Sequence, residues 1–147
     1  MKKFFYLLFF VMLSACSSNE PEQVLQEITS PVDCISNVGW SWNDGVAEAE
    51  GSSYTIDNQI FSFLIKASGK MSFSYKLYDG RIVMKIDDFD AFDVKNSYYV
   101  YQSFSLAVKK GQKVTIKGYD SVIKDIKITG VSDNTNNPEN PNNPWDF

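Results

Sequence analysis

Apolar and polar residues alternate along the middle of the chain, which is the period of a β-strand with one buried face. The segment 71–77 alternates apolar residues with Ser and Lys, and the segment 81–87 repeats this alternation. Asp79-Gly80 lies between them, and both residues tolerate the positive φ of a tight hairpin turn. We therefore predict that the two segments pair as a hairpin. Its buried face is then Met71, Phe73, Tyr75, Ile82, Met84 and Ile86.

The rest of the middle region has the same character. Further β-rich runs cover 60–67, 98–108, 113–119 and 122–129. The turns predicted between them are Ser68-Gly69, Lys110-Gly111 and Gly118-Tyr119-Asp120. Strands that recur about every ten residues, with no convincing helical stretch, predict an all-β antiparallel sandwich for residues 31–131.

The N-terminus has a different pattern. An apolar run, Phe4 to Leu13, follows Lys2 and Lys3. It has about half of the roughly 20 residues that a membrane-spanning helix needs, and this length is typical of a secretion signal. Leu13-Ser14-Ala15-Cys16 resembles the lipobox of bacterial lipoprotein precursors. The resemblance implies a signal peptide at 1–15 and diacylglycerol on the Cys16 thiol. It also implies further acylation, such as palmitate, on the new amino group. The alternative is an ordinary signal with a chance cysteine.

The resemblance also places the protein. A lipid anchor on Cys16 would hold the chain at a membrane of the bacterial cell envelope, and Ser17 after the cysteine favours the outer membrane. Residues 16–30 are polar and acidic and are interpreted as a tether. Residues 132–147 are rich in Asn and Pro, which predicts a disordered tail that ends in Trp145-Asp146-Phe147.

Composition narrows the chemistry. Without residues 1–15 the 14 basic residues fall to 12 against 18 acidic ones, a net charge of −6, so nucleic acid is not an expected partner. The chain has no histidine, which removes the commonest general base and the usual zinc ligand, and we expect no enzyme activity. Once Cys16 is lipidated, Cys34 is the remaining thiol, and it is interpreted as a small core residue rather than a reactive one.

Four stretches together resemble the galactose-binding-like jelly-roll domains of bacterial surface proteins and carbohydrate-binding modules. They are Phe73-Ser74-Tyr75-Lys76, Val83-Met84-Lys85-Ile86-Asp87-Asp88, residues 105–116 (SLAVKKGQKVTI) and residues 122–128 (VIKDIKI). The resemblance implies a jelly-roll sandwich and a role in glycan binding. Val122 stands where that family usually has an aromatic residue, and Lys124 stands where it has Asp.

Two groups of aromatic residues are candidates for glycan stacking. Trp40 and Trp42 share one face of an extended stretch, and Asn43 and Asp44 follow to bind hydroxyls; the alternative is that both rings belong to the core. Tyr99 and Tyr101 point away from the buried face if Val100 and Gln102 point into it. Their alternative is that the rings lie over the sheet or under a loop.

Asp87, Asp88, Asp90 and Asp93 offer four carboxylates in a short segment, which suits a structural calcium ion. The alternative is that these residues supply turn geometry and solubility. No other cofactor is expected. The sequence thus predicts a non-enzymatic, lipid-anchored envelope protein that binds a neutral glycan. The alternative is an envelope protein that binds another protein.

Overall fold

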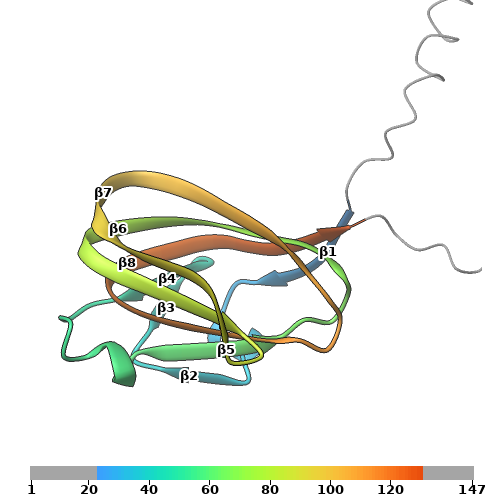
Figure 1. The fold of residues 1–147 in the computed structure, drawn as a ribbon, viewed down its shortest axis with the longest axis horizontal. Coiled ribbons are helices and arrows are strands. Elements are labelled where there is room, and N and C mark those ends of the chain that lie inside the picture. The colour runs from blue at the N-terminus through green and yellow to red at the C-terminus, as the bar shows by residue number, and fades with distance from the viewer. Residues whose placement is uncertain (1–22, 131–147) are drawn as a thin grey trace, which may run out of the picture.

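The computed structural model describes residues 23–130, and they form an all-β antiparallel β-sandwich, as predicted (Figure 1). All seven strand pairings within these residues are antiparallel. The strands are β1 Gln23–Ile28, β2 Ser36–Val38, β3 Ser41–Asn43, β4 Val46–Ala49, β5 Ile60–Leu64, β6 Gly69–Ile86, β7 Phe89–Val108 and β8 Lys113–Gly130. Two short 3-10 turns, η1 Pro31–Asp33 and η2 Ile56–Asn58, lie in the connections.

Strands β6, β7 and β8 are long, and each bends so that its two halves lie in different layers (Figure 1). In the first layer the N-terminal half of β6 pairs with the C-terminal halves of β7 and β8, and β8 continues to β1 and β4, with β3 beyond β4. In the second layer the C-terminal half of β6 pairs with the N-terminal halves of β7 and β8, and β8 continues to β5 and β2. The two layers enclose the core.

The predicted hairpin at Asp79-Gly80 is wrong. Segments 71–77 and 81–87 do not pair with each other, because both belong to β6 and pair with β7 and β8. Asp79 does adopt a positive φ of 67°, and the register on β7 shifts between Leu77 and Gly80. The turn chemistry therefore bends a continuous strand instead of reversing it.

The predicted turn at Gly118-Tyr119-Asp120 is also wrong, because the chain bends there and does not reverse. Asp120 has a φ of 42°, yet β8 runs without a break across this position. The bends of β6 and β8 touch each other, since a Cβ on Gly80 would lie 2.2 Å from the carbonyl oxygen of Tyr119. Gly80 is thus required by close approach of two backbones.

The predicted core positions are largely correct. Met71, Phe73, Tyr75, Ile82 and Met84 are all buried, and Ile86 is partly buried against the same core. They face one another across the two layers, not side by side in one hairpin. The alternation therefore identified the buried face even though it did not identify the pairing.

Two groups of aromatic rings fill the core. At the β6–β7 side, Phe73 contacts Phe92, Phe104 and Tyr75, with ring centroids 5.7, 5.5 and 6.1 Å away. At the opposite side, Trp40, Trp42 and Phe63 surround Phe61. The edge-to-face pairs, Phe73–Phe92 and each tryptophan with Phe61, add to the free energy of apolar burial, by about 0.5–1.5 kcal/mol each.

The predicted tether, residues 16–30, extends too far toward its C-terminal end. Residues Gln23–Ile28 form β1, which pairs with β8 from Gly130 to Ile126 and buries Ile28. The signal peptide, Cys16 and the tail lie outside the described residues. Within 23–130, no helix has the length and apolar character to cross a membrane.

Cys34 follows η1 and packs partly buried against the core, as the sequence indicated. Burial raises the pKa of its thiol to about 11, and the negative charge of Asp33 adds to the effect. The Asp33 carboxylate is fixed beside it by accepting hydrogen bonds from the backbone N–H groups of Thr29 and Ser30. Cys34 is consequently protonated at neutral pH and a poor nucleophile.

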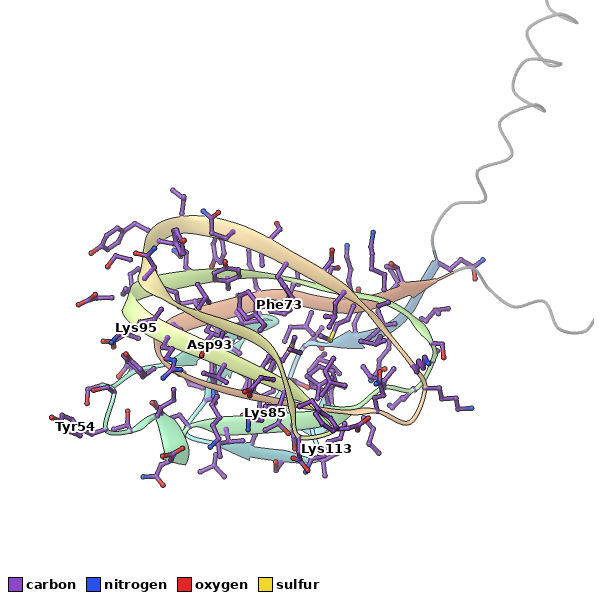
Figure 2. All side chains as sticks on the ribbon, viewed as in Figure 1. Tyr54, Phe73, Lys85, Asp93, Lys95 and Lys113 are labelled. Atoms are coloured by element: carbon purple, nitrogen blue, oxygen red, sulfur yellow. The ribbon has the colours of Figure 1, made fainter. Side chains whose placement is uncertain are left out.

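Phe73→Ala should lower the free energy of unfolding by about 3–5 kcal/mol, because it empties a buried aromatic site between the layers (Figure 2). Urea denaturation of the full chain measures this loss. Phe89→Ala is the matched control, since the Phe89 side chain is 79 % exposed and should cost little. Equal losses for the two variants would contradict the described core.

Cys34 should react with iodoacetamide at least about tenfold more slowly in the folded chain than in urea at pH about 8, because a pKa near 11 leaves little thiolate. The rate should rise as the pH approaches that pKa. Site-resolved mass spectrometry of the labelled chain measures both rates. Equal labelling of folded and unfolded chains would show that the thiol is not protected.

Candidate functional site

The outer face of the first layer carries a row of residues that crosses five strands, and all of them except Val46 are polar. Asn43 pairs with Val46, Val46 with Lys124, Lys124 with Ser74, and Ser74 with Ser103. Directly opposed residues in an antiparallel sheet point to the same face. This row therefore places one predicted site residue, Asn43, on the same surface as Lys124 at the centre of the sheet.

A bulge in β7 carries Tyr99 and Tyr101. Tyr75 pairs with Gln102 whereas Leu77 pairs with Tyr98, so β7 has extra residues at this point. Tyr99 is 69 % exposed, Val100 68 % and Tyr101 39 %. Both tyrosines are therefore exposed, but the condition from which their outward direction was inferred, burial of Val100, is wrong because the bulge breaks the alternation.

Tyr78 extends this group of exposed rings. The Tyr78 ring centroid lies 6.3 Å from that of Tyr99, and 41 % of Tyr78 is exposed. The Lys124 ammonium lies 4.1 Å from the centre of the Tyr101 ring, and the Lys76 ammonium lies 4.7 Å from it. We call Tyr78, Tyr99 and Tyr101 the tyrosine platform, which the two lysines support through cation–π contacts.

Two adjoining hollows lie beside the platform over β6, β7 and β8. They have volumes of about 250 and 410 Å³ and share Ser72, Ser103 and Lys127. The first is also lined by Phe73, Ser74 and Asp125; the second is also lined by Val24, Lys70, Phe104, Ser105 and Thr129. Serine hydroxyls that both donate and accept hydrogen bonds make this surface suitable for hydroxyl-rich ligands.

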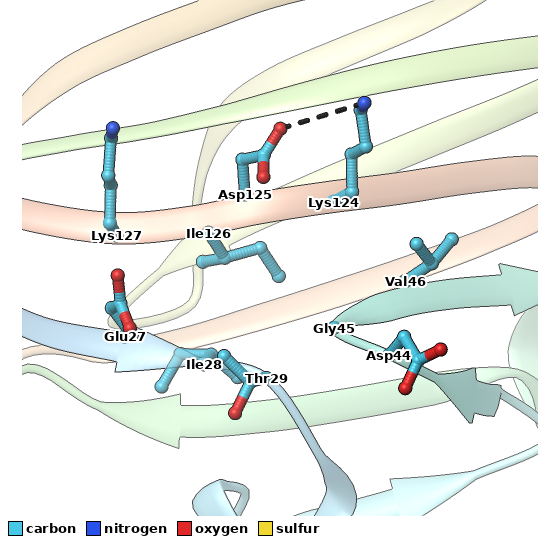
Figure 3. A pocket seen from close by; sticks show the side chains of 10 residues that line it. All are labelled: Glu27, Ile28, Thr29, Asp44, Gly45, Val46, Lys124, Asp125, Ile126 and Lys127. Carbon is cyan, nitrogen blue, oxygen red and sulfur yellow. Dashed lines mark ion pairs between the residues drawn. The ribbon is translucent and has the colours of Figure 1, made fainter.

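A third hollow, of about 380 Å³, opens at the point where the pairing partner of β8 changes between β4 and β1 (Figure 3). Ile126 pairs with Ile28 of β1 and Lys124 pairs with Val46 of β4, so Asp125 lies in a gap between two partners. Charged and polar side chains surround the gap. They are Glu27, Thr29, Asp44, Lys124, Asp125 and Lys127.

The two tryptophans belong to the core, which was the alternative to a sugar-stacking role. Trp40 is 4 % exposed, and its ring packs edge-on against Phe61. Trp42 is partly buried against the same ring, and its indole N–H donates a 2.9 Å hydrogen bond to Asn37 Oδ1. Neither ring belongs to the tyrosine platform, whereas the turn residues Asn43 and Asp44 are exposed.

The four aspartates of the calcium hypothesis do not converge. Asp87 and Asp88 form the β6–β7 turn with φ of 49° and 68°, so these two residues supply turn geometry, as the alternative to calcium binding proposed. Asp93 instead forms a two-point ion pair with Arg81, and Asp90 lies 3.5 Å from Lys85. Within residues 23–130, no three His, Cys, Asp or Glu side chains are close enough to hold a metal ion.

Sequence reasoning missed the residues that join these features. Lys76, Tyr78 and Lys124 lie on adjacent strands and approach one another only in the folded sheet. A local signal existed at Lys124, which stands where the jelly-roll resemblance leads us to expect an acidic residue. Its ammonium lies over Tyr101 and also 3.8 Å from the Asp125 carboxylate.

No protein-family model matches the chain, and no curated protein matches it significantly. Solved structures that the chain matches include a point mutant of a carbohydrate-binding module of family 29. It has 13 % sequence identity and a TM-score of 0.48, over 74 % of this chain and 91 % of the module. A Paenibacillus sp. cycloisomaltooligosaccharide glucanotransferase, in complex with cycloisomaltoheptaose, matches 67 % of this chain with 11 % identity and a TM-score of 0.37. The match covers 16 % of that enzyme.

Proposed function

We propose that this chain is a non-enzymatic, lipid-anchored protein of the bacterial cell envelope that binds glycan on the outer face of its first layer. The observation that carries the proposal is the tyrosine platform, three exposed rings beside hollows lined with hydroxyl and charged groups. Folded proteins seldom leave several aromatic rings clustered on the surface unless the patch binds something. Cys16 supplies the anchor in this proposal.

The platform and its surroundings match the two chemical faces of a sugar. The C–H face of a pyranose ring is apolar and packs on an aromatic ring, while its hydroxyl edge needs donors and acceptors. Ser74 and Ser103 pair directly beside the platform, and Lys124 reaches the Tyr101 ring. A glycan lying along β7 could thus stack on a tyrosine and form hydrogen bonds across β6.

The states of Cys34 and Arg81 support the non-enzymatic part of the proposal. The Cys34 thiol is protonated because burial raises its pKa to about 11. The single arginine, Arg81, is held by Asp93 on the second layer. A binding role accounts for the exposed tyrosines without requiring a reaction.

The alternative, binding of another envelope protein, has one observation in its favour. Val100 is exposed between Tyr99 and Tyr101, and within the described residues β7 pairs with β6 alone, so its outer edge has no strand partner. Such an edge can accept a strand from another chain. A glycan-binding assay on platform variants separates the two functions, because strand addition depends chiefly on backbone hydrogen bonds.

Tyr101→Ala should reduce glycan binding by about tenfold or more, because removing a main aromatic anchor of a binding site costs on the order of 2 kcal/mol, and about 1.4 kcal/mol is a tenfold change in affinity. A glycan array on the detergent-solubilised full chain selects the ligand, and calorimetry measures the loss. Tyr54→Ala is the matched control, since Tyr54 is 93 % exposed on the connection between β4 and β5 and is not one of the platform rings (Figure 2). Capture of an envelope protein with no glycan bound above background would favour the alternative.

Cys16→Ala should release the protein from membranes or leave an uncut precursor, because the thiol is the group that lipoprotein processing modifies. A single acyl chain holds a protein only weakly, so the anchor needs the additional acyl groups. Detergent partitioning and the mass of the purified chain measure both effects. Cys34→Ala is the control, and unchanged partitioning of the Cys16 variant would rule out the anchor.

A further inference from the structure

The gap between β1 and β4 is a consequence of how β8 exchanges partners. Along β8, Lys124 is the last residue that pairs with β4, and Ile126 is the first that pairs with β1, at Ile28. Asp125 stands between them with a φ of 55°, so the edge of β8 is irregular at this point. The hollow in Figure 3 is therefore built by the strand order and does not depend on the position of one side chain.

The groups around this hollow have both signs of charge. Glu27, Asp44 and Asp125 supply carboxylate acceptors, while Lys124 and Lys127 supply ammonium donors (Figure 3). A sugar hydroxyl donates one hydrogen bond and accepts others, so it can satisfy a carboxylate and an ammonium at once. A simple anion or cation would satisfy only one of the two sets.

Lys124 connects the hollow to the tyrosine platform. Its side chain lines the hollow, and its ammonium lies 4.1 Å from the centre of the Tyr101 ring. The ammonium has three N–H donors, and the Asp125 carboxylate, 3.8 Å away, does not use all of them. A saccharide stacked on Tyr101 would thus have its next unit directed toward the gap.

We infer that the hollow between β1 and β4 is a second sugar subsite, and that the ligand is an oligosaccharide whose adjacent units occupy this hollow and the tyrosine platform with Lys124 between them. The inference rests on the proposed function of the platform. It adds a requirement for chain length, because a single sugar unit cannot fill both places. The hollow's volume of about 380 Å³ is within the size range of small-ligand sites, about 300–1,000 Å³.

The test measures how affinity depends on ligand length. Calorimetry on the full chain in detergent uses mono- to hexasaccharides of the cello, xylo, manno and malto series as probes. For the series that binds, affinity should rise by about tenfold when the ligand becomes long enough to reach the hollow, because a few added hydrogen bonds to charged groups contribute about this much.

The double variant Glu27→Gln with Asp44→Asn should remove this length-dependent gain and leave the affinity for the shortest bound sugar within about twofold. Asn tolerates the positive φ of Asp44, so the β3–β4 turn is kept. The matched control is Glu50→Gln with Asp88→Asn, because both residues are exposed and Asp88 also has a positive φ, on the turn between β6 and β7.

The outcomes separate this inference from the proposed function. Affinity that depends on Tyr101 but does not rise with length, or that rises equally in the double variant, would overturn the subsite and leave the platform as the binding site. If neither the glycan array nor these series gives binding above background, both the subsite and the glycan-binding function are rejected. A loss of the length gain in the control variant as well would also reject the subsite.

Discussion

The contact between the bends of β6 and β8 is the constraint on which the sandwich depends. At Gly80 the backbone of β6 comes so close to β8 that an added Cβ would lie 2.2 Å from one carbonyl oxygen of β8 and 2.3 Å from the next. The two strands must therefore bend at the same level, and β7 changes its register on β6 there too. Because three paired strands turn together, each contributes to both layers and the core is enclosed between the halves of the same strands.

This arrangement explains where the aromatic residues lie. Phe73 and Phe104 come from the first-layer halves of β6 and β7, and Phe92 comes from the second-layer half of β7. Their rings meet because the strands fold back across the core. The tryptophans are held in the same way at the other side by Phe61 of β5. Large rings are therefore used mainly to join the layers, and the tyrosine platform is the group left at the surface.

The candidate site lies where the strand pairing is irregular. The bulge in β7 exposes Tyr99 and Tyr101, and the exchange of partners along β8 opens the hollow beside Asp125. Regular pairing would have kept alternate side chains in a flat surface with no recess. Lys124 joins the two places because it stands in the central row of the sheet, with β4 on one side and β6 on the other.

The sequence by itself determined the class of the fold and the buried face of its strands. Alternation in 71–77 and 81–87 is enough to identify Phe73 and Met84 as core residues, because burial of one sheet face depends on a period of two along the strand. The absence of histidine limited the chemistry, whereas the exposure of Tyr99 and Tyr101 depends on the bulge in β7, which the alternation in the sequence did not reveal. Only the tertiary structure decided whether a positive φ at Asp79 or Asp120 reverses a strand or bends it, since both outcomes use the same local geometry. The same holds for the site: Lys124, Tyr101 and Asp44 are far apart in the chain, and the strand order that brings them to one surface depends on long-range pairing that no local pattern encodes.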